Sequence, residues 1–270
     1  MSHPLHRIAA ALERLSPPPP APADLGVHPA YLWRGQVVEA ALRFGPLPLE
    51  RLVGIDRQRD LLVANLSRLA AGLPAQDVLL WGARGQGKSA LVGAAVAHVQ
   101  RNAPALALVQ AATPALDSLP RLFDRLAESP RSFALFIDDL GFDGVGDARA
   151  LRSMLEGGAE ARPANVRLLV TSNRRHLLPR AHGEEEAAIN PRDAADDALA
   201  LADRFGLSLG FHALDQDDYL AIVRGYAEAH GLSFDAEDAV GWATRRGARS
   251  GRIAWHYVVE VAGREGKQLV

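Results

Sequence analysis

Residues 82–89, with the sequence GARGQGKS, place glycines, one lysine and one serine at the spacing of a phosphate-binding loop. In such a loop, backbone N–H groups surround the phosphates, the ammonium group of Lys88 reaches the outer phosphates, and the hydroxyl of Ser89 binds Mg²⁺. Lys88 is one of only two lysines in the chain. The predicted nucleotide-binding residues of this segment are Gly82, Ala83, Arg84, Gly85, Gln86, Gly87, Lys88, Ser89 and Ala90.

The same residues could instead form a tight strand-to-helix turn with a solvated lysine. The flanking sequence favours phosphate binding, because residues 77–81 have the apolar pattern of a buried strand and residues 90–99 that of a helix without proline. The phosphate-binding motif requires this order of strand, loop and helix. We therefore predict that the segment binds a nucleotide.

Two adjacent carboxylates, Asp138 and Asp139, follow the apolar run of residues 133–137. Alone, such a pair often caps a helix or lies in a solvated loop. Here the pair lies about fifty residues after a phosphate-binding loop and at the carboxyl end of a predicted strand, where ligands bind in open α/β sheets. This position favours a role in ligand binding over a helix cap or a solvated loop. Asp138 is then expected to hold Mg²⁺ and Asp139 to polarise an attacking water.

Three further polar residues are candidates because of their positions relative to these motifs. Asn173 closely follows the apolar run of residues 166–171, and its amide could orient a water, although a Ser-Asn pair is also ordinary turn chemistry. Arg204 precedes the last apolar run and Arg252 lies near the start of the last helical stretch. A guanidinium can stabilise a transferred phosphate, but most of the many arginines are expected at the surface.

Apolar runs and helical stretches alternate in the middle of the chain, which predicts an α/β fold. Such alternation implies a five-stranded, mostly parallel sheet covered by helices on both faces. Together with the phosphate-binding loop it predicts a three-layer αβα P-loop NTPase fold. The predicted strands are 77–81, 105–111, 133–137, 166–171 and 206–212, and the predicted helices between them are 88–101, 115–128 and 146–156. Three more helices, at about 215–230, 235–246 and 251–264, predict a small helical domain at the C-terminal end.

The N-terminal part has a different pattern. Residues 5–15 and 30–44 both have apolar residues at helical spacing, and a proline run beginning at Ser16 separates them. A third amphipathic helix is predicted to end at Gly72. We therefore expect an N-terminal helical segment with a Pro-rich linker at 1–45, a nucleotide-binding domain at 46–213 and a helical domain at 214–270.

The bulk composition excludes several kinds of site. The chain of 270 residues has no cysteine, so disulfides, thiolate metal sites and cysteine nucleophiles are excluded. Its formal net charge of −2 gives no general attraction to nucleic acid. Neither a membrane-spanning stretch nor a signal peptide is recognised, which predicts a cytoplasmic protein without membrane insertion.

Taken together and in order, these motifs resemble those of the AAA+ ATPases over about residues 49–263. GARGQGKS is similar to Walker A, ALFIDD to Walker B, and LLVTSN ends like sensor 1, while DRFG and GRIA resemble the arginine-finger box and sensor 2. The segment LERLVGID resembles the one that closes over the adenine, near Val53, Gly54 and Ile55. The detailed sequence looks like one bacterial group of AAA+ ATP-binding proteins that have a domain of unknown function.

The resemblance implies ATP and Mg²⁺ as cofactors and assigns roles by position. Lys88 would bind the β- and γ-phosphates, Ser89 and Asp138 would hold Mg²⁺, and Asn173 would take the sensor position. Arg252 would contact the γ-phosphate within one subunit. Arg204 would act on the nucleotide of a neighbouring subunit, which implies a homo-oligomeric ring or spiral acting on an unknown protein or nucleic-acid partner.

One position departs from the family pattern, and it keeps several functions open. AAA+ hydrolases usually have Glu where this chain has Asp139, which is one methylene shorter. The leading interpretation is an ATPase that drives a conformational change. The alternatives are a nucleotide-dependent binding switch with little hydrolysis and a DNA-associated loader or initiator. A GTPase is disfavoured because no Asn-Lys-x-Asp sequence follows the fourth predicted strand.

Overall fold

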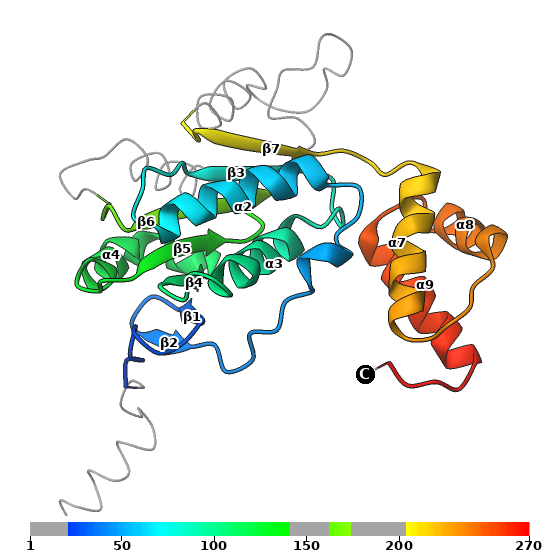
Figure 1. Ribbon diagram of the computed structural model, residues 1–270, viewed down its shortest axis with the longest axis horizontal. Coiled ribbons are helices and arrows are strands. Elements are labelled where there is room, and N and C mark those ends of the chain that lie inside the picture. The colour runs from blue at the N-terminus through cyan, green and yellow to red at the C-terminus, as the bar shows by residue number, and fades with distance from the viewer. Residues whose placement is uncertain (1–20, 141–161, 174–203, 270) are drawn as a thin grey trace, which may run out of the picture.

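The computed structural model describes residues 21–140, 162–173 and 204–269, and Figure 1 shows them as a layered sheet with a separate group of helices beside it. The sheet has seven strands in the order β2-β1-β4-β5-β6-β3-β7. All neighbouring pairs are parallel except β1 with β2. The strands are β1 (Ala30–Trp33), β2 (Val38–Ala40), β3 (Val78–Gly82), β4 (Leu106–Ala111), β5 (Ser132–Ile137), β6 (Val166–Ser172) and β7 (Leu207–Phe211).

Helices cover both faces of the sheet, which makes the three layers that the sequence predicts. One face packs against α2 (Asp56–Ala70) and α3 (Lys88–Gln100) through side chains such as Leu66 and Leu91. The other packs against η2 (Thr113–Ser118) and α4 (Leu119–Ala127) through Leu116 and Phe123. Because both faces are covered, central strand β5 is buried at every position, which explains its apolar run from Phe133 to Ile137.

The helix predicted at residues 30–44 is wrong, because these residues form β1, a turn and β2. Tyr31 and Trp33 are buried and pair in register with Val109 and Ala111 of β4. Gly35 adopts a φ of 100°, which permits the turn between the two strands. The sheet therefore has seven strands rather than five, and the segment from residue 30 belongs to it rather than to a separate helical extension.

Buried Arg131 explains why this N-terminal segment lies against the sheet. Its Nη1 donates to the carbonyl oxygens of Leu25 and His28, each at 2.8 Å, while Nη2 donates to that of Pro104 at 2.9 Å. One guanidinium thus connects two segments about eighty residues apart. The predicted helices at 5–15 and 146–156 and the proline run lie outside the described residues.

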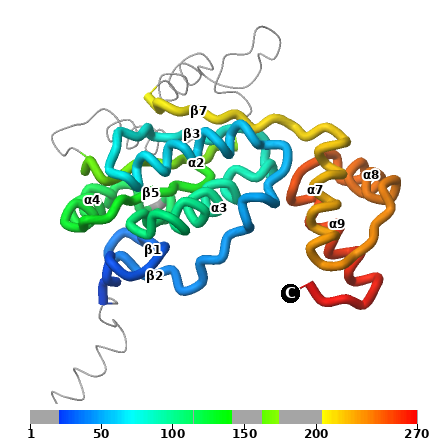
Figure 2. Tube along the Cα trace, viewed as in Figure 1, coloured from blue at the N-terminus to red at the C-terminus, as the bar shows by residue number. Residues whose placement is uncertain are grey.

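The helices α7 (Gln216–Ala229), α8 (Ala236–Arg245) and α9 (Gly251–Arg264) form a small bundle with its own buried core, as the sequence predicts. Figure 2 shows the chain passing from β7 into this bundle, which we call the lid. Asp215, Asp235 and Ser250 cap the three helices by accepting a hydrogen bond from the backbone N–H three residues later. None of the described helices has the length and apolar character needed to span a membrane.

Candidate functional site

The predicted phosphate-binding loop connects β3 to α3 at the carboxyl edge of the sheet. Its three glycines all have positive φ, at 133° for Gly82, 79° for Gly85 and 88° for Gly87. Residues with a side chain rarely adopt this backbone conformation, which explains why glycine occupies these three positions. Gly82 is also crowded, since an added Cβ would lie 2.1 Å from the carbonyl oxygen of Phe211. The start of the loop therefore packs closely against the end of β7.

Lys88 is held beneath this loop with only 6% of its surface exposed. Its Nζ donates to the carbonyl oxygens of Gly82 at 2.7 Å and Ala83 at 2.8 Å, and to Oδ1 of Asn173 at 3.0 Å. Burial lowers the pKa of Lys88 below its ordinary value, an effect that the nearby carboxylates Asp138 and Asp139 oppose. The ammonium group is thus positioned at the loop with the predicted sensor amide beside it.

Ser89, Asp138 and Thr171 form a compact oxygen cluster next to the lysine. Both hydroxyl groups donate to Oδ1 of Asp138 at 2.6 Å. Mg²⁺ binds oxygen ligands and is usually held in proteins by one or two carboxylates together with substrate phosphates. Asp138 supplies such a carboxylate, and Ser89 adds a hydroxyl from the first turn of α3. These residues therefore fit the predicted metal position. Thr171 was not predicted as part of it.

Asp139 has an unusual backbone, because its φ is 53° and it is not a glycine. Its backbone N–H donates to Oγ1 of Thr171 at 2.8 Å, and its carboxylate accepts a hydrogen bond from the side-chain amide of Asn173. The guanidinium of Arg84 forms an ion pair with the same carboxylate at 3.8 Å. The carboxylates of the two adjacent acids therefore have different partners.

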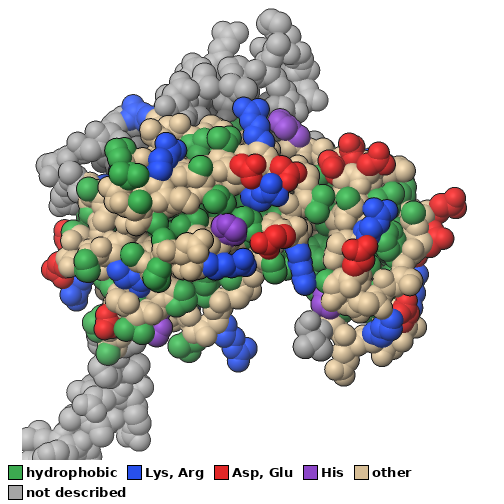
Figure 3. All heavy atoms as spheres, viewed as in Figure 1, with side chains coloured by type: hydrophobic (Ala, Val, Ile, Leu, Met, Phe, Trp, Pro, Cys, Tyr) green, Lys and Arg blue, Asp and Glu red, His purple; other side chains and the backbone are tan. Residues whose placement is uncertain are grey.

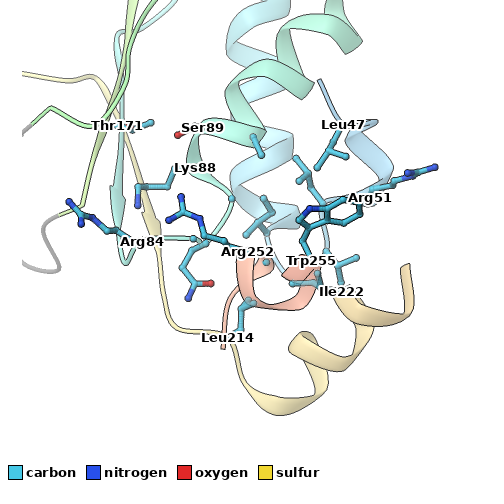
Figure 4. A pocket seen from close by; sticks show the side chains of 18 of the residues that line it. Leu47, Arg51, Arg84, Lys88, Ser89, Thr171, Leu214, Ile222, Arg252 and Trp255 are labelled. Atoms are coloured by element: carbon cyan, nitrogen blue, oxygen red, sulfur yellow. The ribbon is translucent and has the colours of Figure 1, made fainter. Parts of the chain in front are cut away.

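A cavity of about 620 Å³ lies between the loop, the strand ends and the lid, and Figure 4 shows side chains that line it. Lys88, Ser89, Asp138, Asp139 and Asn173 line its polar side. This volume is in the range of small-molecule sites. The structure thus brings together residues that the sequence predicted from three separate strand ends.

The other side of the cavity is apolar and aromatic. Leu47, Leu214 and Ile222 line it with Tyr226 and Trp255, whose rings meet edge to face with centroids 5.3 Å apart. Burial raises the pKa of Tyr226, so its hydroxyl stays neutral. Such surfaces suit the flat face of a nucleotide base.

Sequence reasoning missed these five residues. Trp255 alone had a usable signal, because it lies one helical turn after Arg252.

The predicted adenine segment is only partly at the cavity. Val53 and Ile55 line it, whereas Gly54 is not among the lining residues. Gly54 has a φ of 77°, and an added Cβ would lie 3.3 Å from the side chain of Asp218. Its position therefore fits a turn that brings the segment against α7.

The lid is joined directly to the phosphate-binding loop. Nε2 of Gln86 donates to the carbonyl oxygen of Arg249 at 3.0 Å, and an added Cβ on Gly85 would lie 2.9 Å from Oγ of Ser250. Arg252 lines the cavity one residue into α9, and in Figure 4 its side chain points toward Lys88. Lid and loop thus share one packed contact.

Arg204 lies apart from this cavity. It is exposed and precedes β7, whose carboxyl end at Phe211 adjoins the phosphate-binding loop. It is therefore near the opposite end of that strand and does not line the cavity.

Comparisons with known proteins agree with this architecture. The family model described as a protein of unknown function (DUF815) matches residues 26–265. No curated protein matches.

Solved structures with a similar fold include the Aeropyrum pernix ORC1 protein in complex with DNA. That match has a TM-score of 0.57 at 16% identity and covers 81% of this chain and 65% of that one. The RuvB Holliday junction branch migration motor of Thermotoga maritima matches with a TM-score of 0.54 at 16% identity, covering 83% and 68%. Domain III of the replication initiation protein DnaA of Thermotoga maritima matches with a TM-score of 0.52 at 16% identity, covering 83% and 91%.

These identities are low enough that the likeness concerns the fold. This chain spans about two thirds of the ORC1 and RuvB chains and most of the DnaA domain. The family match covers residues 26–265, which is most of the chain. The chain therefore belongs to the DUF815 family, whose function is unknown, and has the fold of an AAA+ P-loop NTPase.

Proposed function

We propose that this protein binds Mg-ATP in the cavity between the phosphate-binding loop and the lid, and hydrolyses it to drive movement of the lid. The observation that carries the proposal is the convergence of Lys88, Ser89, Asp138, Asp139 and Asn173 on one side of a single cavity. The aromatic side opposite would hold the base, and the adjoining apolar residues would exclude water from it.

Each residue has a proposed task. Lys88 neutralises charge on the outer phosphates, while the backbone N–H groups of the loop bind them directly. Ser89 and Asp138 would hold the Mg²⁺, which would neutralise charge on the phosphates when bound. Asp139 and Asn173 orient the attacking water, and Asp139 accepts its proton.

The lid and the neighbouring subunit complete the proposed site. Arg252 would contact the outer phosphate from α9, so that loss of that phosphate weakens the attachment of the lid. Arg204, exposed on another part of the molecule, would reach the nucleotide of a neighbouring copy in a homo-oligomer. The oligomer would act on a protein or a nucleic acid. On the face shown in Figure 3, basic and acidic side chains are interspersed, which favours neither kind of partner.

A second function, a nucleotide-dependent switch with little hydrolysis, is favoured by the contacts of Asp139. Its carboxylate is one methylene shorter than Glu and is already engaged by Asn173 and Arg84. A small displacement of a catalytic group can reduce the rate about a hundredfold. In this case ATP would close the lid and recruit a partner without rapid turnover.

Steady-state hydrolysis by the wild type and by Asp139→Asn tests the proposal. We expect the variant to bind ATP with a dissociation constant within about threefold of wild type, because the amide keeps the size of the side chain. Turnover should fall about a hundredfold or more, because an amide cannot accept the proton. Equal turnover would exclude Asp139 as the base, and tight binding without wild-type turnover would support the switch.

A further inference from the structure

Arg84 belongs to the phosphate-binding loop but pairs with an acid at the end of β5. Its guanidinium lies 3.8 Å from the carboxylate of Asp139, and their side chains are 74% and 57% exposed. Ion pairs this exposed contribute little to stability, because water screens them and two long side chains lose freedom. The contact is therefore easily exchanged for a stronger one.

Asp139 is also connected to the lysine of the loop. The side-chain amide of Asn173 donates to Asp139, while its Oδ1 accepts from Nζ of Lys88 at 3.0 Å. A chain of contacts therefore runs from Arg84 through Asp139 and Asn173 to Lys88. Lys88 is the cation expected to bind phosphate. A group that drew Arg84 away would leave Asp139 held by Asn173 alone.

Three cationic side chains line the cavity at the phosphate-binding loop. Arg84, Lys88 and Arg252 are these three residues. In the view of Figure 4, Lys88 lies between the side chains of Arg84 and Arg252. Three clustered positive groups favour an anion with several charges.

We propose that Arg84 exchanges Asp139 for the terminal phosphate of bound ATP, and that this exchange frees Asp139 to orient water. A terminal phosphate carries more charge than one carboxylate and offers a planar guanidinium two acceptor oxygens. The inference rests on the proposed function and adds a positioning residue to it.

The exchange makes Arg84 a sensor of the terminal phosphate. With ADP that phosphate is missing, so the ion pair of Arg84 with Asp139 persists. ATP therefore gains a contact that ADP does not gain, and the affinity for ATP should depend on Arg84 more strongly than the affinity for ADP. The contact of Arg84 with the terminal phosphate is thereby coupled to the release of the Asp139 carboxylate.

The test compares the affinities of the full-length chain for Mg-ADP and for a Mg-bound β,γ-imido analogue of ATP, measured by calorimetry. Arg84→Ala should lower the ratio of analogue affinity to ADP affinity about tenfold, and Arg84→Lys should restore part of it because a positive charge still reaches the phosphate. Arg224→Ala is the matched control, since Arg224 is an exposed arginine of α7 that does not line the cavity. Its ratio should equal that of wild type.

An unchanged ratio in Arg84→Ala, with both nucleotides bound by wild type, would overturn the exchange while leaving the proposed function intact. Failure of the wild type to bind either nucleotide would instead overturn the proposed function. Steady-state kinetics give a second readout for the variant that binds. If Arg84 acts as inferred, kcat at saturating ATP is retained in Arg84→Ala, because the carboxylate of Asp139 is then released whichever nucleotide is bound, whereas a large fall in kcat would show that Arg84 acts on the reaction itself and not by holding Asp139.

Discussion

Gly82 illustrates how a single residue fixes the shape of the loop. Its φ of 133° disfavours any side chain, and its Cα faces the backbone of Phe211 so closely that an added Cβ would lie 2.1 Å from the carbonyl oxygen. The obstacle is backbone of a paired strand, which cannot move aside as the end of a side chain can. The first glycine of the loop is therefore needed for packing as well as for conformation.

We expect Gly82→Ala to lower the free energy of unfolding by about 3 kcal/mol, from backbone strain and overpacking together. Gly225→Ala is the control, because Gly225 lies within α7 and has no atoms within 4 Å of an added Cβ. It should gain about 0.5 to 1 kcal/mol from the better helix propensity of alanine. Urea denaturation would measure the free energy of unfolding of both variants. Equal values would show that the backbone of Phe211 does not lie this close to Gly82 in solution.

The polar half of the site was predictable at the level of residues, and the aromatic half was not. The residues from Gly85 to Ser89 and the two acids follow local rules of spacing and strand position. Tyr226 and Trp255 reach the cavity only because α7 and α9 pack together over the loop. That packing depends on tertiary contacts, which no short sequence pattern specifies.

At the level of elements, the attachment of the lid to the loop depends on few contacts. Gln86 is 7% exposed, and its amide donates to the carbonyl oxygen of Arg249 just before α9. A buried hydrogen bond of this kind contributes about 1 kcal/mol. The start of α9 should therefore respond to a change in the loop.

We expect Gln86→Ala to raise hydrogen exchange at the amides of residues 250–254 about fivefold, since about 1 kcal/mol of attachment is lost. Gln58→Ala is the matched control, because Nε2 of Gln58 donates to the carbonyl oxygen of Gly210 at 2.7 Å, away from the start of α9. It should leave exchange at residues 250–254 unchanged. Equal exchange in both variants would mean that other contacts hold the lid.

For residues 30–44 the sequence predicts a helix, whereas the structure has the strands β1 and β2. The apolar residues of this segment recur at helical spacing, so the pattern alone favoured a helix. Pairing of Ala30, Tyr31, Leu32 and Trp33 with β4, and the contacts of Arg131, outweigh that preference. Both are contacts between residues far apart in sequence. The five predicted strands and the lid helices were correct because their periodicity agrees with the tertiary fold.

At the level of the whole molecule, the position of Arg204 leads to a prediction about assembly. It lies outside the cavity, and we propose that it acts on the nucleotide of a second copy. We expect Arg204→Ala to bind ATP like wild type in the monomer but to lose about tenfold or more of the hydrolysis per subunit of an assembly, as loss of an arginine finger does. Hydrolysis and light scattering on the same samples would measure both.

Assemblies that contain two different variants provide the control for a role of Arg204 between subunits. Arg204→Ala and Lys88→Ala protein should each be poorly active, but mixed assemblies should regain activity where a wild-type finger meets a wild-type loop. Mixed assemblies that form and remain inactive would contradict a role for Arg204 between subunits.

The most direct test of the whole account is calorimetric titration of Mg-ATP into the wild type and into Lys88→Ala. The buried ammonium contacts the loop carbonyls and Asn173 at the center of the polar side of the cavity. We predict one ATP per chain for the wild type and no measurable binding for the variant, with circular dichroism confirming that it is folded. Unchanged affinity in a folded Lys88→Ala would contradict the assignment of this cavity as the nucleotide site.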